Sequence, residues 1–224
     1  MLKALYGENI MPDFKFEDEC KGVVAGVDEA GRGPWVGPVV AGAVVFLRRD
    51  EITPYLFDHL NDSKKLSEKR REELFDLIKT EAQRGNLCYG IGEASAKEID
   101  EINILEASFL AMKRAVEKLK IKPDVALIDG NRLPKNFSCQ TKCVITGDAL
   151  SFSISAASVM AKVYRDRLMK DMALKYPGYG FEKNAGYGTK EHVEGLKKYG
   201  ITPEHRKSYK PIKEIIEKNV KNLN

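Results

Sequence analysis

Cysteine and histidine are scarce in this sequence, and their spacing excludes several kinds of site. The 224 residues include four cysteines and three histidines. The cysteines do not have the spacing of a disulfide framework, and Cys139 and Cys143 lack a histidine pair to complete a zinc site. We therefore expect reduced thiols and no zinc centre.

Long apolar stretches are absent as well. No hydrophobic run approaches the roughly 20 residues that a membrane-spanning helix needs. Residues 1–10 form too short a segment, followed by an acidic run at 13–19, to resemble a secretory signal. Together with the reduced cysteines, these absences predict a cytoplasmic protein without a membrane partner.

Charge is abundant and unevenly placed. Charged residues make up 31% and hydrophobic residues 43% of the sequence, as is typical of a globular protein. The formal net charge is +4, and residues 183–224 carry ten Lys or Arg against five Asp or Glu. This basic segment fits a polyanionic partner, although a solvated lysine-rich surface has the same composition.

The hydrophobic pattern predicts an α/β protein. Strands are expected at residues 22–28, 38–47, 87–93, 125–128 and 143–146. Helices are expected after Ser67 to about residue 83, from a capping box at Ser95 and Glu98, from Asn103, and at 153–175, 190–199 and 211–220. The order β-β-β-α-β-α-β-α, with small helices between, indicates a mixed sheet flanked by helices. We expect a lead-in at 1–20, one α/β domain at 21–180 and a basic helical extension at 181–224 packed on it.

Carboxylates stand at the ends of three predicted strands. Asp28 and Glu29 end the first, Asp129 follows the fourth, and Asp148 follows the fifth. Because sites in α/β sheets gather at strand ends, these four side chains are expected to converge. Clustered carboxylates need cations, and hard oxygen ligands favour Mg²⁺ or Mn²⁺. Two such ions suit phosphodiester hydrolysis, in which one activates water and the other stabilises the leaving oxygen.

Each acid also has a structural alternative. Asp129 begins an ordinary turn, and Asp148 is an ordinary helix N-cap. Asp28 and Glu29 are harder to explain in this way, because the glycine-rich turn at 31–33 follows them directly. Acids at the ends of three strands of one chain, together with a basic C-terminal segment, favour a site that binds metal and phosphate.

The turn Gly31-Arg32-Gly33 has a second use. Its backbone amides and carbonyls are unshielded by side chains, so they can approach a sugar and hydrogen-bond a 2′-hydroxyl, which distinguishes RNA from DNA. A turn needed only for its geometry is the alternative. It is not a Walker phosphate loop, since no Gly-Lys-Ser/Thr sequence follows.

The sequence around these residues resembles the type 2 ribonucleases H, the ribonuclease HII group. The shared motifs occur in the family's order at 28–34, 62–66, 147–148, 156–158, 161–163, 165–167, 176–177, 186–189, 203 and 205–206. The chain departs from the common pattern at Trp35-Val36, at Ala185 and at Tyr209. None of these departures involves a carboxylate.

The resemblance implies a ribonuclease H-like fold and an endonuclease that cuts the RNA strand of RNA/DNA hybrids. It also implies incision at a ribonucleotide embedded in duplex DNA, on its 5′ side, with 3′-hydroxyl and 5′-phosphate ends. Carried onto this chain, the catalytic metal ligands are Asp28, Glu29, Asp129 and Asp148.

The resemblance also implies substrate contacts. The backbone of residues 31–33 and the hydroxyl of Tyr187 would read the 2′-hydroxyl at the RNA-to-DNA junction, although a core position is the alternative for Tyr187. The residues expected to contact phosphates are Arg32, Lys64, Lys162, Arg165 and the lysines of the C-terminal segment. His192 and His205 are within possible reach of the site, but positions on helix surfaces are expected for both. We expect the protein to act as a monomer.

Two other functions remain open on the sequence. A non-catalytic protein that binds RNA/DNA hybrids would have no reason to place four acids against a polyanion. A different nuclease of the same fold, such as a resolvase or an integrase-like enzyme, would need neither the glycine turn nor Tyr187. The sequence therefore favours the metal-dependent endoribonuclease.

Overall fold

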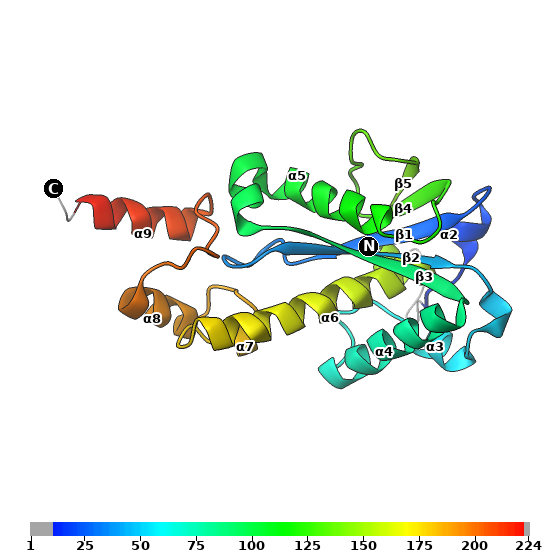
Figure 1. The fold of residues 1–224 in the computed structure, drawn as a ribbon, viewed down its shortest axis with the longest axis horizontal. Coiled ribbons are helices and arrows are strands. Elements are labelled where there is room, and N and C mark those ends of the chain that lie inside the picture. The colour runs from blue at the N-terminus through cyan, green and yellow to red at the C-terminus, as the bar shows by residue number, and fades with distance from the viewer. Residues whose placement is uncertain (1–10, 222–224) are drawn as a thin grey trace, which may run out of the picture.

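A five-stranded sheet forms the centre of the computed structural model, which describes residues 11–221 (Figure 1). The strands are β1 (Val24–Ala30), β2 (Val39–Phe46), β3 (Leu87–Ala94), β4 (Val125–Asp129) and β5 (Gln140–Val144). β1, β2 and β3 pair antiparallel, whereas β4 pairs parallel with β1 and with β5, in the order β3-β2-β1-β4-β5. The predicted mixed five-stranded sheet is confirmed. The prediction that residues 1–10 are no secretory signal lies outside the described residues.

Helices cover both faces of the sheet. In Figure 1, α5 (Ala96–Glu117) lies on one face, and α6 (Phe152–Lys175) and α4 (Glu68–Arg84) lie on the other. The shorter helices are α2 (Lys15–Asp18), α3 (Pro54–His59), α7 (Phe181–Asn184), α8 (Lys190–Tyr199) and α9 (Lys210–Lys221), with 3-10 turns η1 (Arg49–Glu51) and η2 (Gly147–Ala149). No helix within residues 11–221 combines the length and the apolar character needed to cross a membrane.

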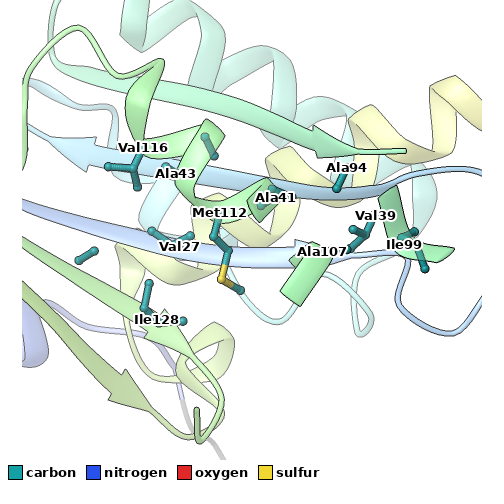
Figure 2. Packing of buried hydrophobic residues seen from close by; sticks show 13 residues of the cluster. Val27, Val39, Ala41, Ala43, Ala94, Ile99, Ala107, Met112, Val116 and Ile128 are labelled. Atoms are coloured by element: carbon teal, nitrogen blue, oxygen red, sulfur yellow. The ribbon is translucent and has the colours of Figure 1, made fainter. Parts of the chain in front are cut away.

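The two faces bury different side chains of the same strands, because successive residues of a strand point to opposite faces. Figure 2 shows Ala41 and Ala43 of β2 in the cluster that contains Met112 of α5. Val44 of β2 packs with residues of α4 and α6 instead. Seven of the eight residues of β2 are buried, which explains the uninterrupted apolar run in its sequence.

The helices begin at the predicted caps. The side chain of Ser67 accepts a hydrogen bond from the backbone of α4, and Gly85 ends that helix in the left-handed conformation. Ser95 and Glu98 form the predicted capping box of α5. Asn103, with a φ of 67°, divides α5 into two segments. The second segment is the longer helix that the sequence predicts from this residue.

Three predictions of secondary structure are wrong in detail. β1 continues to Ala30 rather than ending at Asp28, because its ladder with β2 extends to the pair Ala30–Val40. β5 lies at Gln140–Val144 and not at 143–146, since an edge strand exposes polar residues and gives little apolar signal. The long elements run β-β-α-β-α-β-β-α, because α4 separates β2 from β3 and the described chain has no helix between β4 and β5.

The C-terminal helices pack at the end of α6. An apolar cluster joins Val36 and Met169 to Phe181 of α7, Leu196 of α8 and Ile212 of α9. Val36 lies in the connection between β1 and β2, just after the glycine-rich turn. The C-terminal segment is therefore packed against that connection, which points toward α8 and α9 in Figure 1.

Small residues allow α6 to lie close to β1 and β2. Residues 155–161 of α6 are all buried. A Cβ atom built on Gly26 of β1 would overlap the backbone of Ile154, and one built on Gly42 of β2 would overlap the carbonyl of Ala157. A larger residue at either glycine therefore displaces the helix from the sheet.

We predict that Gly42→Ala lowers the free energy of unfolding by about 3 kcal/mol, because the new methyl group meets backbone rather than a movable side chain. Gly85→Ala is the matched control, since nothing lies within 4 Å of its Cβ position and only the left-handed φ of 82° adds strain. The control should cost about 1 kcal/mol. Urea denaturation measures both, and equal losses would contradict the close approach of α6.

Candidate active site

Three of the predicted carboxylates meet where β1, β4 and β5 lie side by side. The parallel pairing of β1 with β4 ends at the pair Val27–Ile128. Asp28 and Asp129 are the next residues of the two neighbouring strands, so they lie side by side. Asp148 joins them from η2, because the amide of Gly147 donates a 2.7 Å hydrogen bond to Oδ1 of Asp129. Carboxylate oxygens of Asp28, Asp129 and Asp148 lie within 4.8 Å of one another.

Burial and mutual repulsion disfavour the charged forms of these acids. Burial, followed by the charge of Glu29, raises the pKa of Asp28 well above its usual range. Burial and the charge of Asp129 raise the pKa of Asp148 to about 6. Burial also raises the pKa of Asp129, although the amide of Gly147 opposes the change. Carboxylates are hard oxygen ligands, and a bound cation would relieve their mutual repulsion. The cluster therefore fits a divalent cation such as Mg²⁺ or Mn²⁺.

Glu29 does not belong to this group of three, although its charge acts on the pKa of Asp28. It follows Asp28 on the same strand, so alternation turns it toward the other face of the sheet. It lines a cavity with Arg32, Met112 and Asp129. Nη1 of Arg32 lies 3.2 Å from Oε1 of Glu29. Burial raises the pKa of Glu29, and the charge of Arg32 opposes the shift.

Lys64 borders the acids from the polar loop after α3. Its Nζ lies 3.8 Å from Oδ2 of Asp148, and most of its side chain is exposed. Burial lowers the pKa of Lys64, but the charges of Asp28 and Asp148 outweigh this effect and raise it. The residue therefore places an accessible positive charge beside the acids.

Three further polar residues support the acids and were not among the predicted site residues. Ser158 of α6 lies beside Asp28 and opposes the rise of its pKa. Ser63 holds Ser158 through a 2.9 Å bond between their hydroxyls. Asp62 lies near Asp148 and contributes to its raised pKa, after burial and Asp129. The sequence shows a polar loop at 62–63, but contacts between segments 95 residues apart leave no local pattern.

A buried arginine of the C-terminal segment holds the turn at residues 31–33. The guanidinium of Arg206 donates to the carbonyl oxygens of Gly31 at 2.6 Å, Arg32 at 2.9 Å and Gly37 at 2.9 Å. The hydroxyl of Tyr209 donates to the Arg32 carbonyl as well. Within residues 11–221, the amides at 31–33 have no hydrogen-bond acceptor. The turn therefore offers N–H groups to a ligand, while two of its carbonyls are already occupied.

The prediction that Arg165 contacts phosphates is wrong. The residue is 2% exposed, and its guanidinium donates to the carbonyl oxygens of Pro38 at 3.0 Å, Ala185 at 3.0 Å and Val36 at 3.1 Å. Burial lowers the pKa of Arg165 to about 10, so it stays charged at neutral pH. A Cβ atom on Gly31 would overlap this side chain. Arg165 therefore supports the turn from inside the protein.

Tyr187 lies at the surface beside the glycine-rich turn. It is 51% exposed, which removes the alternative of a core tyrosine. A Cβ atom built on Gly33 would lie 3.1 Å from Cε1 of Tyr187, so the ring rests against the turn. Lys162 of α6 is half-buried and donates a 2.7 Å hydrogen bond to Asp166, which neutralises much of its charge.

His192 and His205 lie in the interior, so the expectation of helix-surface positions is wrong. They are 0% and 1% exposed, and their Nε2 atoms are 3.1 Å apart. The rings of Trp35, Tyr179 and Phe181 surround them. Burial lowers the pKa of His192, and burial with the charge of His192 lowers the pKa of His205 to about 4. Both imidazoles are therefore neutral at neutral pH.

Solved structures share this fold. The ribonuclease H2 of Pyrococcus horikoshii OT3 matches with a TM-score of 0.69 and 32% identity, over 89% of this chain and 100% of that chain. Bst-RNase HIII, solved in complex with Mn²⁺, matches with a TM-score of 0.64 and 16% identity, over 87% of this chain and 69% of that chain. The fold and the acidic group define a metal-dependent endoribonuclease of the ribonuclease H type.

Sequence comparisons identify the family within this class. The family model described as Ribonuclease HII matches residues 25–212. The ribonuclease HII of Paramagnetospirillum magneticum is 51% identical over 202 residues, which are 90% of this chain and 97% of that protein. The ribonuclease HII of Endomicrobium trichonymphae is 54% identical over 200 residues, or 89% and 91% of the two chains. The chain belongs to the ribonuclease HII family, whose members cleave RNA in RNA/DNA hybrids, and the predicted membership is confirmed.

We predict that the buried histidines make the protein less stable in acid. Unfolded His205 titrates near pH 6.5 and the folded residue near 4, so the unfolded state binds more protons between these values. The contribution of His205 to the free energy of unfolding is therefore complete above about pH 6.5, and it falls by about 3 kcal/mol as the pH drops toward 4.

The free energy of unfolding of the wild type is compared with that of His205→Asn by urea denaturation in EDTA. The clustered carboxylates titrate in the opposite sense, but they are present in both proteins, so their effect cancels in the difference. The wild type should be more stable at pH 7.5, and the difference should shrink below pH 6. A difference that stays constant from pH 7.5 to 4 would contradict a neutral His205.

Proposed function

We propose that this protein incises duplex DNA on the 5′ side of an embedded ribonucleotide, besides cleaving RNA in hybrids, and leaves 3′-hydroxyl and 5′-phosphate ends. One observation carries the proposal: the exposed ring of Tyr187 rests against Gly33, beside a turn whose amides are free. Backbone donors next to an aromatic ring suit recognition of a ribose 2′-hydroxyl that is followed by a deoxyribose.

We assign the divalent cations to Asp28, Glu29, Asp129 and Asp148. The close approach of two buried carboxyl groups and one half-buried carboxyl group supports this assignment, since such a cluster is unfavourable without positive charge. Glu29 adjoins the same Asp129 from the cavity on the other face. When bound, two Mg²⁺ or Mn²⁺ ions supply activation of the attacking water and stabilisation of the leaving oxygen.

The chain's own residues orient these acids. The amide of Glu29 donates a 2.7 Å hydrogen bond to Oδ1 of Asp28, and the amide of Gly147 holds Asp129, so neither carboxyl group rotates freely. Lys64, 3.8 Å from Asp148, supplies a mobile positive charge that suits the scissile phosphate or a neighbouring one.

Substrate recognition divides between the turn and the surrounding basic residues. The amides of residues 31–33 are the proposed donors to the 2′-hydroxyl, and the hydroxyl of Tyr187 is a further partner. Arg32 and Lys162, with the lysines of the segment at 183–224, are proposed phosphate contacts that set position rather than sequence. Because the acids, the turn and Tyr187 all come from one chain, we infer that a monomer suffices. We also infer a cytoplasmic location, where RNA/DNA hybrids and ribonucleotides in DNA occur.

The deciding experiment uses a labelled DNA duplex with one ribonucleotide, an all-DNA duplex as control, and Mg²⁺ or EDTA. We expect nicking only on the 5′ side of the ribonucleotide and only with the metal. Nicking of the all-DNA duplex would overturn recognition of the 2′-hydroxyl by the turn. Cleavage of hybrids without incision at the lone ribonucleotide would overturn the junction activity.

We predict that Asp28→Asn and Asp148→Asn each reduce cleavage about a thousandfold or more, because each removes a charged ligand of the cations. Mn²⁺ should raise the melting temperature of the wild type and much less that of either variant. Without metal, both variants should be at least as stable as the wild type, since a buried repulsion is relieved. Wild-type cleavage by either variant would refute the assignment of these ligands.

We predict that Tyr187→Ala slows incision at a lone ribonucleotide about tenfold more than cleavage of a long RNA/DNA hybrid. A long hybrid offers a 2′-hydroxyl at every position of its RNA strand, so it depends less on a junction reader. Tyr187→Phe, which keeps the ring, separates the hydroxyl from the stacking surface. Equal losses on the two substrates for Tyr187→Ala would make the tyrosine merely structural.

A further inference from the structure

Two buried histidines connect the C-terminal segment to Tyr187. His192 lies in the first turn of α8, and His205 lies between α8 and α9. Nδ1 of His192 is 3.0 Å from the carbonyl oxygen of Tyr187, and Nε2 of His192 is 3.1 Å from Nε2 of His205. Nδ1 of His205 is 2.8 Å from the backbone nitrogen of Thr202. The pair thus forms a continuous hydrogen-bonded chain from Thr202 to Tyr187.

The two ends determine the direction of this chain. The amide of Thr202 is a donor, so Nδ1 of His205 must accept and carries no hydrogen. Neutral His205 therefore has its hydrogen on Nε2 and donates it to Nε2 of His192. His192 then carries its own hydrogen on Nδ1 and donates it to the Tyr187 carbonyl. One tautomer of each ring satisfies every contact, and burial keeps both rings neutral by lowering the pKa of each.

The residue at the end of the chain is the one whose ring adjoins Gly33. The carbonyl of Tyr187 accepts from His192 and also from the amide of Thr189 at 2.8 Å. These two donors fix the peptide group of Tyr187, although its side chain is 51% exposed. Without the donor from His192, the backbone at Tyr187 has more freedom, and the ring no longer has one position against the turn.

The same histidines also contact the segment that follows the turn. The ring of Trp35 lies 5.5 Å from that of His192, and Val36 forms an isolated β-bridge with His205. A Cβ atom on Gly188 would overlap the ring of Trp35. The pair therefore lies between the loop of Tyr187 and the continuation of the glycine-rich turn, and contacts both.

We propose that His192 and His205 are positioning residues for recognition of the RNA-to-DNA junction: their hydrogen-bonded pair fixes the backbone of Tyr187 so that its ring stays against Gly33. The inference rests on the proposed role of Tyr187. Neither histidine touches the substrate or the acids in this scheme. Substitution therefore alters the choice between substrates more than the rate of cleavage itself.

Two amide substitutions at His192 separate the contacts of its two nitrogens. His192→Asn places an amide near the position of Nδ1 and keeps a donor for the Tyr187 carbonyl. His192→Gln places its amide near the position of Nε2, keeps the contact with His205 and loses the one with Tyr187. Glu194→Gln is the control, since Glu194 is an exposed residue of the same helix.

The measured quantity is selectivity, the rate at a lone ribonucleotide in DNA divided by the rate on a long RNA/DNA hybrid. We expect His192→Gln to lower selectivity about fivefold, the effect of one hydrogen bond, and His192→Asn to lower it less. Glu194→Gln should leave both rates unchanged. On a Tyr187→Ala background, His192→Gln should cause no further fall, because its effect passes through Tyr187.

Folding is checked with the intrinsic fluorescence of Trp35, the one tryptophan of the sequence, and with thermal unfolding. If His192→Gln does not fold, His205→Asn replaces it, because its amide oxygen keeps an acceptor for Thr202 and only the contact with His192 is lost. The same fall in selectivity is expected.

The outcomes distinguish the inference from the function on which it rests. If Tyr187→Ala lowers selectivity but folded His192→Gln slows both substrates equally, the positioning role is overturned and the junction reader stands. If Tyr187→Ala leaves selectivity unchanged, the proposed role of Tyr187 fails, and the positioning role fails with it. Additive effects of the two substitutions on selectivity would also overturn the inference.

Discussion

Like charge held in a small buried space is the constraint on which the rest of this structure depends. Carboxylate oxygens of Asp28, Asp129 and Asp148 lie within 4.8 Å of one another, and repulsion alone would drive them apart. Pairing of β1 with β4 prevents this for Asp28 and Asp129, and the hydrogen bond from the amide of Gly147 to Asp129 holds η2, which carries Asp148, beside them. Their arrangement is thus built before any cation arrives, and the cation relieves a repulsion that folding imposes.

The close approach of α6 serves the same arrangement. Gly26 and Gly42 bring the helix near enough for Ser158 to lie beside Asp28, which lies on the same face of β1 as Gly26. A conventional packing distance would leave Asp28 without this partner. Packing of the sheet against α6 and orientation of the candidate metal ligand are therefore one structural feature, and a change at either glycine affects both.

Recognition depends on a different part of the chain from the acids. Arg165 and Arg206 are buried guanidinium groups that bind backbone carbonyls of the β1–β2 connection, and together they shape the turn at 31–33. Guanidinium suits this task because its donors point in fixed directions and its charge persists when buried. Arg206 comes from the C-terminal segment, as does the histidine pair behind Tyr187. That segment, basic on average, thus contributes buried supports as well as surface charge.

Local patterns in the sequence predicted most of the strands and long helices and placed acids at strand ends. The caps at Ser67 and Ser95 and the strand-end position of Asp129 depend on neighbouring residues, so they can be read along the chain. The resemblance of the motifs led to the family. Element boundaries were less accurate where an edge strand, β5, exposes polar residues.

Only the tertiary structure decided which polar residues face the site and which lie inside the protein. Glu29 turns toward the cavity beside α5 because strand alternation continues past Asp28, and pairing with β2 determines that. Arginine and histidine are residue types that usually lie at the surface, yet backbone carbonyls surround Arg165 and aromatic rings surround His205, all from distant segments. Burial depends on which segments meet, and one sequence read residue by residue contains no record of those contacts. The sequence thus determined the chemistry available, and the fold determined where it acts.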